Sequence, residues 1–137
     1  CLKVGIPGIS ENIHVRSIVG NFLEHSRIFF FLNDGEEELY MGSADWMPRN
    51  LDRRVEILFP VLDDTLKEKV KHILDVELAD NTKAHVLKPD GEYEKIDRRG
   101  KVLVNSQKQF CEEAVAAVPK TDHVYRERVF VPAEPAE

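Results

Sequence analysis

Two short groups of polar residues in the first third of the chain have the composition of an anion-handling site. His25 and Arg27 lie two residues apart at the start of a predicted strand, so their side chains are expected on one face. An imidazole can move a proton or attack phosphorus, and a guanidinium can hold phosphate oxygens in a bidentate manner. Gly42 and Ser43 end a second predicted strand, where a small residue and a hydroxyl let an anion approach the backbone. Together these residues suggest phosphoryl chemistry.

Each of these residues also has a structural interpretation. A single histidine in a strand is more often a structural or surface residue than a catalytic one. Arg27 could be a solvent-exposed strand charge, and Gly42 with Ser43 could form only a turn. Taken singly the signals are weak, and their order along the chain favours the functional interpretation.

A hairpin is the element expected to bring these groups together. His25–Leu32 is rich in aromatic and β-branched residues, Asn33-Asp34-Gly35 is a strong turn signal, and Glu38–Ser43 has the pattern of a second strand. Arg53–Val61 is predicted as a third strand by its period-two apolar pattern. The continuous apolar run 28–32 predicts a central strand that is covered on both faces.

The rest of the chain alternates between strand and helix signals, which predicts an α/β fold with a mixed β-sheet and flanking helices. An aspartate cap and apolar residues at helical spacing predict a helix over Asp64–Leu78, and Asn105 or Ser106 is expected to cap a second helix that ends near Val118. The remaining predicted elements are a strand at Leu2–Ile6, a strand followed by a helical turn within Val15–Leu23, and a strand at His85–Leu87 before the Pro89-Asp90-Gly91 turn.

The composition is that of a soluble globular domain. The chain has 137 residues, of which 42% are hydrophobic and 32% charged, and this predicts one domain over residues 1–131 with a mobile polar tail at 132–137. A net charge of −6 argues against general nucleic-acid binding. No apolar run approaches the roughly 20 residues of a membrane-spanning helix. Two cysteines are too few for a disulfide framework and favour a reducing cytoplasm. The start at Cys1 suggests a piece of a larger protein.

The order of the polar groups resembles the H-x-K … G-S-x-N signature of the phospholipase D superfamily, with Arg27 in the lysine position and Asp45 in the asparagine position. Three longer stretches, GIPGISENI, VRSIVGNFLEHSRIFFF and GSADWMPRNLDRRVE, resemble the last domain of bacterial polyphosphate kinases of the first family. This resemblance extends from Cys1 to about Val118.

The resemblance implies a phospholipase-D-like fold and part of a kinase active site. In that family the terminal phosphate of ATP passes reversibly to polyphosphate through a phosphohistidine, and two such domains face each other. The phosphorylated histidine belongs to the preceding domain, whereas His25 matches the second histidine, which lies at the phosphates of the nucleotide. The resemblance therefore assigns phosphate binding and acid–base assistance to His25, and a place at the bound phosphates to Arg27 and Ser43.

The same resemblance implies the partners of the chain. ATP is the substrate and Mg²⁺ its companion ion, with the metal held by domains that this chain lacks, so no metal ligand is assigned here. The expected partners are ATP or ADP, inorganic polyphosphate, the preceding catalytic domain and further copies of the full-length enzyme. The expected location is the cytoplasm, with peripheral membrane association of the full-length enzyme as an alternative. The chain alone is expected to be inactive.

One departure from the superfamily pattern bears on the alternatives. The acid expected five residues after the lysine position falls on Leu32, which argues against independent phosphodiesterase action. Two alternatives stay open: a phosphodiesterase that dimerises to pair two copies of His25, and a non-catalytic domain that binds a polyanion.

Several other residues allow two interpretations. Arg49, Arg53 and Arg54 could bind polyphosphate or form ion pairs with Asp52 and Glu56, and both interpretations have equal weight. Trp46 is expected to lie in the core rather than to form a lid over the site. The basic loop at 98–101 is expected to be a solvated surface.

Overall fold

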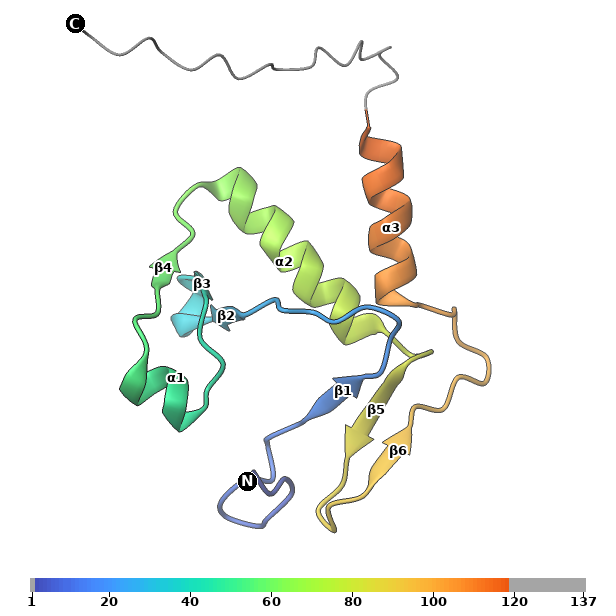
Figure 1. Cartoon of the computed structure of the whole chain (residues 1–137). Helices are drawn as coiled ribbons and strands as arrows, with labels where there is room; N and C mark the ends of the chain where they lie inside the picture. The colour runs from blue at the N-terminus through green and yellow to red at the C-terminus, as the bar shows by residue number, and fades with distance from the viewer. Residues whose placement is uncertain (1, 119–137) are drawn as a thin grey trace, which may run out of the picture.

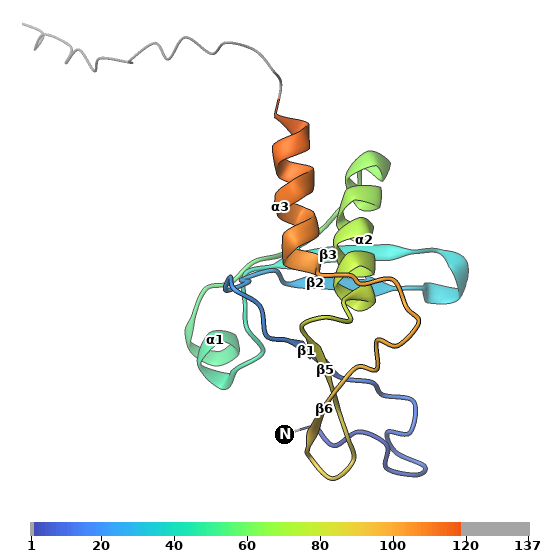
Figure 2. The ribbon, with the colours of Figure 1, turned by 90° about the vertical axis from the view of Figure 1, so that its right-hand side faces the viewer.

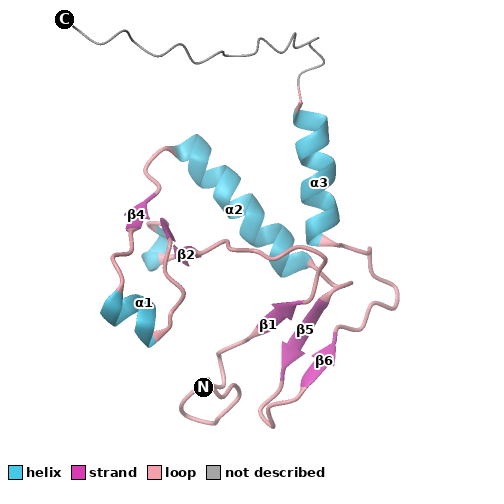
Figure 3. Cartoon of the chain, viewed as in Figure 1, coloured by secondary structure: helices cyan, strands magenta, loops and turns pink. Residues whose placement is uncertain are grey.

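The computed structural model describes residues 2–118, which form two three-stranded antiparallel sheets and three α-helices (Figures 1 and 3). The tail predicted at 132–137 lies outside the described residues. The strands are β1 (Arg16–Ile18), β2 (Ile28–Phe31), β3 (Glu38–Gly42), β4 (Leu58–Pro60), β5 (Ala84–Leu87) and β6 (Tyr93–Lys95). The helices are α1 (Pro48–Arg53), α2 (Asp64–Ala79) and α3 (Ser106–Ala117), with a short 3₁₀ turn η1 (Asn33–Gly35). The α/β class is thus confirmed.

The predicted hairpin is confirmed as the β2–η1–β3 unit. Its turn contains three consecutive residues with positive φ, at 44° for Asn33, 55° for Asp34 and 98° for Gly35, which are the residue types that tolerate this backbone region best. Antiparallel pairing then sets Phe29 opposite Tyr40 and Ile28 opposite Met41. Figure 2 shows the tip of this hairpin extending beyond α2.

Helix α2 covers one face of the β2–β3–β4 sheet. It begins where the Asp63 carboxylate accepts a hydrogen bond from the backbone N–H of Leu66 at 2.9 Å, as the cap signal predicts. Its Val70 packs with Leu39 and Val61 in the buried core of this layer. The helices predicted at 64–78 and 105–118 are therefore both confirmed, each to within a residue or two.

The opposite face of this sheet is open to solvent. Phe31 retains 54% of its surface exposed, and Phe29, two residues earlier in the same strand, lies on the same open face. The prediction of a central strand covered on both faces is therefore wrong for the described residues, since β2 is an edge strand with α2 on one face only. Its continuous apolar run reflects one packed face and one uncovered apolar face.

The second sheet, in the order β1–β5–β6, is joined to α2 and α3 through Asp80. Its carboxylate is fully buried and accepts hydrogen bonds from the backbone N–H groups of Thr82, Lys83 and Ala84 at 2.8–3.2 Å. The other carboxylate oxygen accepts from the backbone and hydroxyl of Ser106 at 2.8 and 3.0 Å. Burial acts to raise the pKa of Asp80, but these hydrogen bonds outweigh it and lower the pKa on balance.

Three predicted elements differ from the structure. The segment predicted as a strand at Leu2–Ile6 is a loop, because the Ser10 hydroxyl donates to the Lys3 carbonyl at 2.7 Å and accepts from the Ile6 N–H at 3.0 Å. Within Val15–Leu23 only β1 forms, and no helical turn follows it. The third predicted strand, Arg53–Val61, is confined to β4, since Pro48 begins the unpredicted helix α1 just before it. No helix among residues 2–118 has the length and apolar character needed to span a bilayer.

Candidate functional site

His25 lies on an exposed segment that precedes the hairpin. Strand β2 begins at Ile28, so the prediction that His25 opens the strand is wrong, and the alternation of side chains along a strand cannot be applied to it. The imidazole is exposed and forms no hydrogen bond within residues 2–118. It is therefore free to meet a ligand that arrives from outside the domain.

The guanidinium of Arg27 is directed to two neighbours. Its Nε and Nη2 atoms lie 2.9 and 2.7 Å from Oδ1 of Asp45, and its Nη1 donates to the backbone carbonyl of His25 at 2.8 Å. Only 20% of the Arg27 side chain is exposed. The arginine thus links the backbone at His25 to the chain that follows β3.

Ser43 comes directly after β3 and bridges to the segment before β4. Its hydroxyl donates to Oε2 of Glu56 at 2.5 Å and accepts from the backbone N–H of Ile57 at 3.1 Å. Glu56 was not predicted as a site residue, because thirteen positions separate it from Ser43 and no local pattern joins the two. The single hydroxyl proton of Ser43 is therefore donated to the Glu56 carboxylate in this structure.

The hairpin brings these groups together at its open end. The backbone N–H of Gly42 donates to the Arg27 carbonyl at 3.0 Å, which places the ends of the two strands side by side, as predicted. A shallow hollow of about 480 Å³ lies here, with Ser26, Arg27 and Asp45 contributing its polar wall. His25 is not part of this wall. The structure therefore groups Arg27 with the Gly42–Ser43 backbone and leaves the imidazole exposed beside them.

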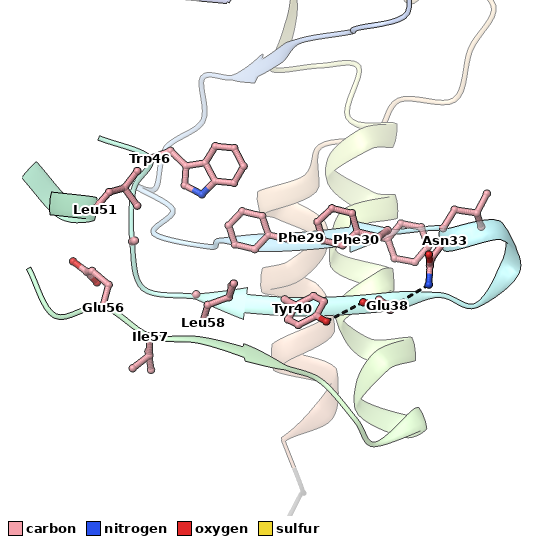
Figure 4. Close-up of a pocket in the computed structure, with 14 residues that line it drawn as sticks. Phe29, Phe30, Asn33, Glu38, Tyr40, Trp46, Leu51, Glu56, Ile57 and Leu58 are labelled. Carbon is pink, nitrogen blue, oxygen red and sulfur yellow. Dashed lines mark hydrogen bonds between the residues drawn. The ribbon is translucent and has the colours of Figure 1, made fainter. Parts of the chain in front are cut away.

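A larger groove of about 990 Å³ runs along the open face of the β2–β3–β4 sheet (Figure 4). Trp46 stacks on Phe29 at one end, with ring centroids 5.5 Å apart and an interplanar angle of 16°. The indole is 77% exposed, so the prediction that Trp46 lies in the core is wrong for the described residues. At the other end Glu38 accepts hydrogen bonds from Tyr40 and Asn33 at 2.9 and 3.0 Å.

The arginines that follow the site are exposed. None of Arg49, Arg53 and Arg54 forms an ion pair with Asp52 or Glu56 in the part of the chain that the structure describes, so the ion-pair interpretation is wrong. Their charges are available to an external anion. In the basic loop at 98–101, Arg99 pairs with Asp97 at 2.8 Å, in agreement with a solvated surface.

The described part of the chain offers no cluster of metal ligands. Between residues 2 and 118 no three His, Cys, Asp or Glu side chains are arranged to hold a metal ion. Fold and site together define an α/β domain with a polar strand end, an exposed imidazole beside it and an uncovered apolar face.

Comparison with known proteins supplies the family. The family described as polyphosphate kinase C-terminal domain 2 matches residues 1–107. A polyphosphate kinase of Pseudomonas aeruginosa is 54% identical over 119 residues, which are 86% of this chain and 17% of that protein. A polyphosphate kinase of Lactiplantibacillus plantarum is 50% identical over 123 residues, which are 90% of this chain and 17% of that protein.

A solved structure supports the same relationship. The crystal structure of polyphosphate kinase from Porphyromonas gingivalis superposes with a TM-score of 0.73 at 37% identity, covering 81% of this chain and 17% of that one. The chain belongs to the polyphosphate kinase family, in which it corresponds to C-terminal domain 2. It spans about a sixth of the length of these relatives.

Proposed function

We propose that residues 1–131 form the carboxy-terminal catalytic domain of an ATP:polyphosphate phosphotransferase. The domain contributes to the reversible transfer of the terminal phosphate of ATP to polyphosphate, through a phosphohistidine in the preceding domain. Family membership carries this proposal, because relatives at 50–54% identity are named polyphosphate kinases.

Within this reaction His25 contacts the phosphates and assists proton movement. Its exposed imidazole suits a site that is completed by another domain, because a ligand can reach it without breaking a hydrogen bond to residues 2–118. Arg27 holds the His25 backbone and the Asp45 carboxylate, and its remaining N–H groups can meet a phosphate oxygen at the polar hollow. Ser43 supplies a hydroxyl whose single proton is donated to Glu56 in this structure and turns to a phosphate oxygen when the ligand binds.

The proposal extends to partners and location. ATP or ADP and polyphosphate are the substrates, and Mg²⁺ accompanies the nucleotide, held by residues outside this chain. The preceding catalytic domain covers the apolar face around Phe29, where Phe31 and Trp46 have an exposure that is unusual for large aromatic side chains. The full-length enzyme is a cytoplasmic homo-oligomer, with peripheral membrane association as the alternative.

One observation supports a polyanion as the substrate. Arg49, Arg53 and Arg54 are exposed and carry no ion pair within residues 2–118, although the chain as a whole is acidic. The same observation suits the alternative of a non-catalytic polyanion-binding domain. The phosphodiesterase alternative has no comparable support, because Leu32 is an exposed apolar residue where the superfamily pattern has an acid.

Two histidine variants of a complete kinase that carries this domain distinguish these possibilities. His25→Ala should lower kcat about 10²- to 10⁴-fold in both directions of the reaction, as expected for loss of acid–base assistance. The matched control is His72→Ala, since His72 is an exposed α2 residue that only pairs with Glu113 of α3 at 3.0 Å. Unchanged synthesis and reverse reaction in His25→Ala would overturn the catalytic proposal and favour a binding domain.

A further inference from the structure

One side chain of α3 holds the segment that leads to His25. The amide of Gln107 is buried, with 8% of the residue exposed, and it faces residues 20–24. Its Oε1 accepts from the backbone N–H groups of Asn21 and Phe22 at 2.7 and 3.0 Å. Its Nε2 donates to the Phe22 carbonyl at 2.8 Å and to Oε1 of Glu24 at 2.7 Å.

These four contacts use the full hydrogen-bonding capacity of the amide, which has two donor hydrogens and two acceptor lone pairs. Phe22 is bonded through both its N–H and its carbonyl, in the way that a neighbouring strand would bond it. Residues 20–27 belong to no sheet in the structure. The Gln107 amide therefore takes the place of a strand partner for a segment that would otherwise have unpaired backbone groups.

The Gln107 amide lies too close to Gly20 to admit a side chain at that position. A Cβ atom on Gly20 would lie 2.2 Å from Oε1 of Gln107, well inside van der Waals contact. Any side chain at position 20 would push the amide away. Glycine is thus required here by close approach.

The Gln107 amide and its four hydrogen bonds act as a clamp on residues 20–24. On the α3 side this clamp is fixed to the rest of the domain. Ser106, the residue before Gln107, donates two hydrogen bonds to the buried Asp80 carboxylate. On the other side of His25, Arg27 donates to the His25 backbone carbonyl at 2.8 Å. The backbone at His25 is therefore held from both sides, whereas its imidazole stays exposed.

We infer that Gln107 is a positioning residue for His25, which sets the backbone of residues 21–24 so that the imidazole meets the transferring phosphate. This inference rests on the proposed function of His25. Gln107 touches neither substrate nor reacting atoms, and it acts through the segment it binds. A misplacement of about 1 Å in a reacting group can lower a rate about 10²-fold, which makes such a clamp kinetically important.

The test uses a complete kinase that carries this domain, with Gln107→Met as the variant. Methionine keeps the length and most of the volume of the side chain but makes none of the four hydrogen bonds. Gln109→Met is the matched control, because Gln109 lies on the same helix and, among residues 2–118, its side chain bonds only Glu113, at 2.8 Å. Hydrogen exchange measured by mass spectrometry should show faster exchange in residues 20–25 for Gln107→Met and no change for Gln109→Met.

The kinetic result separates positioning from general stability. Gln107→Met should lower kcat about 10- to 100-fold, with little change in KM for ATP and a melting temperature close to that of Gln109→Met. Unchanged exchange, or faster exchange with an unchanged kcat, would overturn the inference. If His25→Ala is impaired and Gln107→Met is not, the proposed function stands and the clamp fails. If His25→Ala is fully active, the proposed function fails and the inference fails with it, whatever Gln107→Met shows.

Discussion

Glu77 is the side chain whose removal should change the pH dependence of stability most clearly. It lies on α2 beside Glu24, in a hollow of about 460 Å³ between α2, α3 and the segment before β2. Burial, a hydrogen bond with Glu24 and repulsion from that carboxylate raise the pKa of Glu77 from 4.5 to about 7. The folded protein therefore holds a proton here that the unfolded chain releases at lower pH.

The direction of the pH effect on stability follows from this difference in pKa between the folded and the unfolded protein. The contribution of Glu77 to stability is fully present below about pH 4.5 and is lost as the pH rises to about 7. Each pH unit in that interval accounts for about 1.4 kcal/mol, which sets a ceiling of roughly 3 kcal/mol. Because the side chain is partly exposed, solvent screening reduces the expected effect to roughly 1 to 2 kcal/mol.

The assay is urea unfolding of the wild type and Glu77→Gln at pH 5 and pH 8, followed by circular dichroism. Glutamine stays neutral and can still donate to Glu24, so the variant should exceed the free energy of unfolding of the wild type by less than about 0.5 kcal/mol at pH 5 and by roughly 1 to 2 kcal/mol at pH 8. Glu68→Gln, on the exposed face of α2, is the control and should show no such difference. An equal effect of Glu77→Gln at both pH values would refute the explanation that burial and Glu24 raise the pKa of Glu77.

Three further substitutions test contacts around the site. Gly20→Ala should lower the free energy of unfolding by about 1–3 kcal/mol in urea titrations, since its Cβ would overlap the Gln107 amide. Replacing the buried Asp80 carboxylate by alanine should cost about 3–5 kcal/mol. Because the pKa of Asp80 is lowered, acid titration should also show the wild type losing stability as the pH falls below about 4. Ser43→Ala should lower kcat of a complete kinase about tenfold, through loss of the hydroxyl that is proposed to contact the phosphates, with Ser43→Thr restoring most of it. Wild-type stability in the first two, or an unchanged kcat in the third, would contradict these expectations.

Much of the fold was predictable because its signals are local. The turn at Asn33-Asp34-Gly35 needs only residues that accept positive φ, and α2 needs only its Asp63 cap and an apolar period. The loop at residues 3–10 was not predictable, because a single serine hydroxyl at Ser10 replaces the strand partner that the apolar residues suggest.

The site was predictable by residue type and less so by geometry. His25 and Arg27 were expected on one strand face, but the partner that holds the segment before them is Gln107, more than eighty positions away. The partners of Arg27 and Ser43, Asp45 and Glu56, are likewise distant by eighteen and thirteen positions. Such side-chain pairings depend on tertiary packing, and no periodicity in the sequence encodes them.

A crystal structure of the complete kinase with a non-hydrolysable ATP analogue tests the central claim most directly. The proposed role of His25 requires a phosphate oxygen within about 2.6–3.2 Å of an imidazole nitrogen. It also predicts that the ligand lies at the open end of the β2–β3 hairpin, beside Arg27 and Ser43. A nucleotide bound with its phosphates elsewhere, and an imidazole at His25 that meets only solvent, would contradict the account.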